Sequence, residues 1–172
     1  MKSFFAVAFS LLILTSCDRN FVYGEDIDIA MDGWHKDSVL VFKTDSLTEL
    51  PSIITIGINI RNTTDYFYRN MYLFVEIQIP GQEHPIKDTL NHLLMTPDGY
   101  WMEGVEGASV MESMAYLEDK DVELKESTVY YPYAIQNPEN GIYQIKVKQG
   151  MRDDLLKEVV SVGARIEKLV QE

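Results

Sequence analysis

The sequence is short of the residues that build most metal and nucleophile sites. It has one cysteine, Cys17, and three histidines among 172 residues. A single cysteine excludes an internal disulfide, so packing has to hold the fold together. The three histidines, His35, His84 and His92, lack the helical or hairpin spacing of metal ligands. We therefore expect no metal site and no cofactor.

Short signatures of catalysis are missing as well. The chain has no Gly-x-Ser-x-Gly elbow, no phosphate-cradling Gly-Lys-Ser/Thr motif and no zinc spacing. Carboxylates are plentiful, but pairs such as Asp153-Asp154 have none of the flanking pattern of a calcium loop. We predict no catalytic residue. A hydrolase with two carboxyl groups about 5 to 9 Å apart in a cleft stays as an alternative.

Positive charge is scarce. Lys and Arg number 15 against 27 Asp and Glu, which gives a net charge of −12. Such a surface repels phosphate backbones and anionic headgroups, so nucleic acid is excluded as a partner. The acidity is explained either by solubility outside the cytoplasm or by an acidic docking patch.

No apolar run is long enough to span a bilayer as a helix, which needs about 20 residues. The run from Phe4 to Leu14 follows Met1-Lys2 and ends in Leu14-Thr15-Ser16-Cys17. A basic start, a short apolar segment and small residues before a cysteine are typical of a lipoprotein signal. We predict that residues 1–16 are removed and that acyl chains on Cys17 hold the membrane. The alternative is an N-terminal core segment with a buried cysteine.

The rest of the chain alternates apolar and polar residues as strands do. Removing residues 1–16 leaves 156 residues, a length that is enough for one domain over 17–172. The loss of Lys2 changes the net charge from −12 to −13. Isoleucine recurs at 54, 56, 58 and 60, with Thr55, Gly57, Asn59 and Arg61 between. The ranges predicted as strands are Phe21–Ile29, Val39–Lys43, Ile54–Arg61, Asn70–Ile79, Ile86–Leu93, Thr128–Ile135, Tyr143–Lys148 and Val160–Glu167. Turn formers at 62–65 suggest that the strands on either side are neighbours.

About eight strands with one apolar face each predict two sheets packed face to face. The fold class is all-β, an antiparallel β-sandwich of Ig-like or jelly-roll-like type. An acidic insert covers about 105–126, and within it 109–126 is predicted as a short helix or a solvated loop.

Aromatic residues in loops or on outward strand positions are candidates for a partner or ligand surface. They are Trp34, Tyr66, Tyr68, Tyr72, Phe74 and Trp101. Exposed rings of this kind form protein interfaces or stack on sugars. Packing beneath loops is the alternative for each.

Several segments resemble, in order, the gliding motility lipoprotein GldH family of the Bacteroidetes. They are Gly33–Asp37, Asn59–Asn62, Asp65-Tyr66, Leu73–Glu76, Lys87–Leu90, Pro97–Gly99 with Trp101, Gly141–Tyr143, Met151–Asp153 and Val162–Lys168. The resemblance covers essentially the whole mature chain. It departs at 105–126, where family members have a shorter glycine-rich link.

The resemblance implies a cell-envelope lipoprotein of the gliding apparatus, a system tied to type IX secretion, with no assigned catalytic activity. We expect the lipid on Cys17 to place it on the periplasmic face of the outer membrane, with other gliding and secretion envelope proteins as partners. The alternative function is a β-sandwich module that binds envelope glycans on a platform containing Trp34 and Trp101.

Overall fold

The computed structural model describes residues 20–102, 106–107 and 123–169, and every regular element in these ranges is a strand. The strands are β1 (Phe21–Asp28), β2 (Trp34–His35), β3 (Leu40–Lys43), β4 (Ile53–Thr63), β5 (Asn70–Gln78), β6 (Ile86–Leu93), β7 (Glu106–Gly107), β8 (Leu124–Tyr130), β9 (Ile135–Gln136), β10 (Gln144–Gln149), β11 (Leu155–Leu156) and β12 (Val159–Lys168). Over the same ranges, no helix has the length and apolar character needed to cross a membrane.

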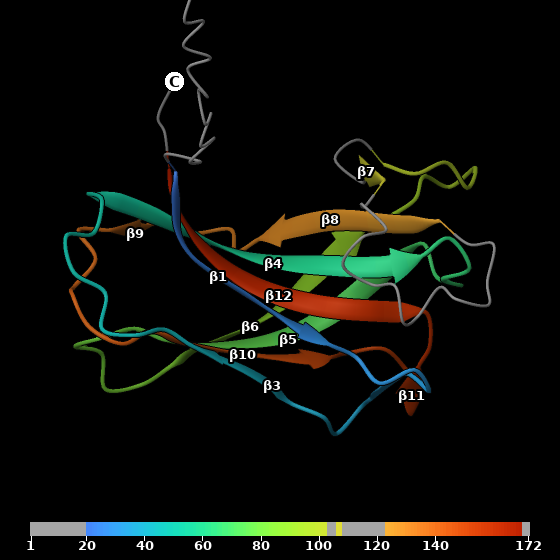
Figure 1. Ribbon diagram of the computed structural model, residues 1–172, viewed down its shortest axis with the longest axis horizontal. Coiled ribbons are helices and arrows are strands. Elements are labelled where there is room, and N and C mark those ends of the chain that lie inside the picture. The colour runs from blue at the N-terminus through green and yellow to red at the C-terminus, as the bar shows by residue number, and fades with distance from the viewer. Residues whose placement is uncertain (1–19, 103–105, 108–122, 170–172) are drawn as a thin grey trace, which may run out of the picture.

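The strands form two main sheets that face each other, as Figure 1 shows. One sheet has the order β1-β12-β4-β8-β7, with β9 also paired to β4, and the other has the order β3-β10-β5-β6. A small third sheet joins β11 and β2, and all the pairs are antiparallel. The all-β prediction is confirmed, and the layers form a β-sandwich. The structure has more strands than the expected eight or so, because β2, β7, β9 and β11 are two-residue strands.

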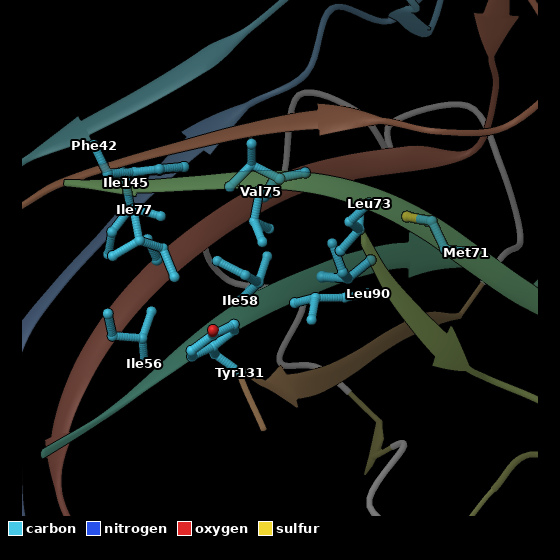
Figure 2. Close-up of a cluster of buried hydrophobic side chains, with 14 of the residues drawn as sticks. Phe42, Ile56, Ile58, Met71, Leu73, Val75, Ile77, Leu90, Tyr131 and Ile145 are labelled. Atoms are coloured by element: carbon cyan, nitrogen blue, oxygen red, sulfur yellow. The ribbon is translucent and has the colours of Figure 1, made fainter. Parts of the chain in front are cut away.

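The two-residue alternation decides which side chains form the core. On β4 the isoleucines 54, 56, 58 and 60 are each at most 1% exposed. Figure 2 shows Ile56 and Ile58 lying across the interface from Val75 and Ile77 of β5. Burying a side chain of this size contributes about 1.5 to 3 kcal/mol. The facing apolar rows therefore hold the two sheets together.

The prediction that the strands flanking residues 62–65 are neighbours in one sheet is wrong. β4 pairs with β12 and β8, whereas β5 pairs with β10 and β6. The chain between them crosses from one sheet to the other, which lets the apolar faces of both strands enter the same core. Turn-forming residues indicate a change of direction, but they do not specify the pairing partner.

The prediction of a helix or loop over 109–126 is wrong at its end. Leu124 is buried in β8, and Glu126 of the same strand accepts a hydrogen bond from Arg61 Nε at 2.9 Å. Residues 108–122 lie outside the described residues. The strand predicted over Thr128–Ile135 is divided in the structure, since β8 ends at Tyr130 and β9 begins at Ile135.

The described chain begins and ends at the same end of the sandwich. Lys168 N donates to Asn20 O at 2.7 Å, and Leu169 N donates to Ile53 O at 3.1 Å. β1 and β4 both run antiparallel to β12, so both begin at this end, which we call the Asn20 end. The 11 residues of β4 place Thr63 about 35 Å away, at what we call the Thr63 end (Figure 1).

Candidate functional site

The side of the four-stranded sheet that faces away from the core carries apolar and lysine side chains together. Pairing places Val41, Lys146, Glu76 and Lys87 in one row across β3, β10, β5 and β6. Side chains alternate along a strand, and the buried Val75 next to Glu76 points into the core. The row therefore faces outward.

Aromatic side chains occupy the next outward positions. Lys148, Phe74 and Thr89 form the second row, and Phe74 is 49% exposed. Tyr72, two residues along β5, is exposed beside it. A Cβ added to Gly150 would lie 3.1 Å from the Phe74 ring and 3.2 Å from Tyr72 Cβ. The glycine therefore leaves the space that both aromatic side chains use.

These rows border a groove of about 700 Å³, which we call the outer groove. The residues that line it are Val39, Val41, Phe74, Val75, Glu76, Lys87, Asp88, Thr89, Lys146, Val147 and Lys148. Three lysines against two carboxylates give this lining a charge of +1, on a chain whose net charge is −12. The outer groove is thus a locally basic and apolar surface on an acidic protein.

Ion pairs set the electrostatics of the outer groove. Lys146 Nζ donates to Glu76 Oε1 at 2.7 Å, and Lys87 Nζ lies 3.2 Å from Glu76 Oε2. The hydrogen bonds from Lys146 and Lys87 hold the pKa of Glu76 below its usual range. Lys148 Nζ is 3.8 Å from Asp37 Oδ1, which is too far for a hydrogen bond. Lys148 is therefore the groove lysine best able to pair with a ligand.

Two of the aromatic candidates predicted from the sequence lie in the core. Trp34 is 1% exposed, and its Nε1 donates to Ser38 O at 3.2 Å. Tyr66 is buried, with its hydroxyl donating to Asn70 O at 3.2 Å. Burial raises the pKa of the Tyr66 hydroxyl. Neither ring is accessible to a partner.

The other four candidates lie in three places. Tyr72 and Phe74 flank or line the outer groove. Tyr68 lies at the Thr63 end, where its hydroxyl donates to Asp153 Oδ2 at 2.8 Å; this bond raises the pKa of Tyr68. Trp101 is half-buried against the core, and Lys125 Nζ lies 5.9 Å from its ring centroid. Of these four, only Tyr72 and Phe74 lie together; Tyr68 instead packs edge to face against the buried Tyr66, with the ring centroids 6.0 Å apart. Cys17, the predicted lipid site, lies outside the described residues.

Sequence reasoning missed other surface residues. Val39, Val41 and Lys148 belong to the outer groove, and Phe67 is 87% exposed in the connection between β4 and β5. The alternation of Val41 and Lys43 around the buried Phe42 could have marked the outward face of β3. Nothing in the sequence shows that β3, β10 and β5 lie side by side.

The histidines are separate from one another. His92 is 7% exposed, and its Nε2 lies 2.7 Å from Ser127 Oγ, so a hydrogen bond joins β6 to β8. Burial lowers the pKa of His92 to about 4, which keeps the ring neutral. His35 and His84 are exposed. In the part of the chain that the structure describes, no three His, Cys, Asp or Glu side chains are placed to hold a metal ion.

The fold and the outer groove define a β-sandwich domain with an exposed apolar and basic sheet face. The family model described as GldH lipoprotein matches residues 21–166. The chain belongs to the GldH lipoprotein family, which confirms the resemblance seen in its sequence.

Named relatives agree with this assignment. The chain is 33% identical to a protein of Christiangramia forsetii named gliding motility lipoprotein GldH homolog, over 98% of both chains. It is 29% identical to the gliding motility lipoprotein GldH of Flavobacterium johnsoniae, over 91% of this chain and 90% of that one. Among solved structures, a GH115 4-O-methyl-α-glucuronidase with specificity for decorated arabinogalactans overlaps with a TM-score of 0.37 and 12% identity, over 90% of this chain and 18% of that chain. That overlap is too loose to carry a functional argument.

Proposed function

We propose that this protein is a lipid-anchored, non-enzymatic component of a gliding motility machinery associated with type IX secretion. Acyl chains on Cys17 attach it to the periplasmic face of the outer membrane. The names of the relatives support the lipoprotein character and the link to gliding. Its work is done by contact with other envelope proteins.

The outer groove carries this proposal. Val39, Val41, Tyr72 and Phe74 expose apolar surface on one sheet face. Exposed apolar patches of this kind mark interaction sites, because water solvates them poorly. The lining of the groove comes from all four strands of the sheet, so a segment that crosses β3, β10, β5 and β6 would contact the whole groove. We propose that it holds a segment of a partner protein in which apolar and acidic residues are mixed.

Charge favours an acidic partner. The lysines of the groove outnumber its carboxylates, and Lys148 Nζ lies 3.8 Å from Asp37 Oδ1, beyond hydrogen-bond distance. Complementary charge steers encounter and selects between partners. A glycan platform built on tryptophan is less suited to this structure, because Trp34 is buried and Trp101 does not line the groove.

The anchor is tested by Cys17→Ala. We expect the variant to fold but to leave the membrane fraction, with loss of gliding or secretion. Mass spectrometry of the wild-type protein should find an acylated residue 17. Normal motility and secretion from the Cys17→Ala protein at normal levels would contradict the anchoring proposal.

The groove is tested by a photo-crosslinking amino acid in place of Phe74, combined with Lys148→Glu. Crosslinks should map to acidic segments of an envelope protein, and Lys148→Glu should reduce their yield severalfold. Lys43→Glu is the matched control, because Lys43 is an exposed lysine of β3 outside the groove lining. Crosslinks to a second copy of this chain, saturable binding of envelope polysaccharide at the groove, or equal losses from both lysine variants would overturn the proposal.

A further inference from the structure

The connection between β4 and β5 is tightly fixed at the Thr63 end. Tyr66 N donates to Thr63 O at 3.2 Å, and Asp65 N donates to Thr63 Oγ1 at 3.2 Å. The same hydroxyl donates to Glu158 Oε2 at 2.7 Å, which ties the connection to the segment before β12. Hydrogen bonds within the turn and from Thr63 to Glu158 therefore fix the backbone that leads to Phe67.

Neighbouring tyrosines hold the position of Phe67. Tyr66 and Tyr68 are both hydrogen-bonded through their hydroxyls, to Asn70 O and Asp153 Oδ2. The Phe67 ring meets Tyr68 edge to face, with the centroids 5.3 Å apart and an interplanar angle of 89°. Phe67 is nonetheless 87% exposed. A large apolar ring is thus presented to solvent on a preorganised support, which limits the entropy lost on binding.

An acidic hollow of about 290 Å³ lies beside Phe67. Asp65, Asp153 and Glu158 line it together with one cation, Lys157, so the charge of its ionisable lining is −2. This sign is opposite to that of the outer groove. Acidic side chains repel anionic headgroups, so the charge disfavours insertion of Phe67 into a lipid surface.

We infer that Phe67 anchors a second docking site, which takes a partner protein offering an apolar pocket edged by Lys or Arg side chains. The ring fills the pocket, and the basic side chains face the acidic hollow. Aromatic side chains, Phe among them, are enriched in protein interfaces, and aromatic anchors that fill a pocket carry much of the binding energy. Two sites of opposite charge allow this chain to hold two different partners at once.

The position of Phe67 suits a protein that holds two partners at once. The Thr63 end lies about 35 Å from the Asn20 end, as the length of β4 requires. Figure 1 shows the connection between β4 and β5 opposite the start of β1. If Cys17 is anchored as proposed, this end projects away from the membrane. Only this orientation rests on the proposed function.

The test places p-benzoylphenylalanine at residue 67 of the full chain in its own cells. Tyr133 is the matched control site, because it is an exposed aromatic residue located beyond β8 at the Asn20 end. We expect a protein crosslink at 67 that is absent at 133, on a peptide with Lys or Arg next to apolar residues. Phe67→Ala should lower the co-purification of that partner by at least about tenfold, and Asp65→Lys should weaken it as well.

Other outcomes overturn the inference. These are no crosslink above the control, a lipid adduct, a second copy of this chain, a crosslink to residues 108–122 of the same chain, or a crosslinked peptide without basic residues. If crosslinks from residue 74 are retained in such a case, the outer-groove proposal stands and only the inference about Phe67 fails. The reverse result, with crosslinks kept at 67 and lost at 74, removes the groove proposal and leaves this one.

Discussion

The buried His92 should make the stability of the fold depend on pH between about 7.5 and 5, above the ordinary pKa values of Asp and Glu. His92 lies in β6 and its Nε2 is 2.7 Å from Ser127 Oγ in β8, so the pair bridges the two sheets. Burial lowers the pKa of His92 from 6.5 to about 4. The folded protein therefore resists a proton that the unfolded chain accepts.

The sign and size follow from this difference. Above pH 6.5 the ring is neutral in both states and has no effect. As the pH falls below 6.5, only the unfolded chain is protonated, so the free energy of unfolding decreases until the pH passes the folded-state pKa. The loss is about 2 kcal/mol by pH 5 and about 3 kcal/mol once the pH is well below 4.

The perturbation is the double variant His92→Leu with Ser127→Ala, which removes both polar partners together and leaves neither unpaired. Urea unfolding is followed by the fluorescence of the buried Trp34 at several pH values from 7.5 to 5. The double variant should lose about 2 kcal/mol less than wild type over this range. His84→Ala, at an exposed histidine, should keep the wild-type pH dependence.

An unchanged decline in the double variant would refute the reasoning, because the decline would then arise from other groups. The same holds if His84→Ala removes the pH dependence. Ser127→Ala alone should destabilise the fold by about 1 to 3 kcal/mol at pH 7.5, since it leaves the buried imidazole unpaired.

Three further predictions concern packing, backbone and charge. Ile58→Ala should lower the free energy of unfolding by about 2 to 5 kcal/mol in urea titrations, because the side chain is 1% exposed. Gly33→Ala should cost more than Gly99→Ala in the same assay: both glycines have positive φ, but only at Gly33 does an added Cβ meet backbone, at 2.8 Å. Lys146→Ala should raise the pKa of Glu76 toward its ordinary value in an NMR titration, and no rise would contradict the ion pair.

Much of the secondary structure could be predicted from alternation. The isoleucines of β4 and the apolar residues of β5 point into the core because a strand places every second side chain on one face. β6 was predicted with the bounds that the structure shows. The start of β8, Leu124 to Glu126, was not predicted as a strand because the acidic and lysine residues around it resemble a solvated segment. Pairing with β4 makes these residues part of a strand.

The candidate site was predictable only in part. Tyr72 and Phe74 stand at outward positions of an alternating strand, so their exposure follows from the pattern. Trp34 lies in the two-residue strand β2, where no periodicity indicates a face, and its pairing with β11 buries it. Phe67 had no pattern either, since its exposure depends on how the neighbouring tyrosines pack.

The sequence by itself determined most of the longer strands, the apolar face of each, the acidic character of the chain and the family. These are properties of short windows, in which chemistry and spacing act within one segment. The tertiary structure decided which strands are neighbours, and with them the outer groove, the bond between His92 and Ser127, and the acidic hollow beside Phe67. Such features join residues far apart in the chain, and they form only when burial of the common core selects one pairing of the sheets.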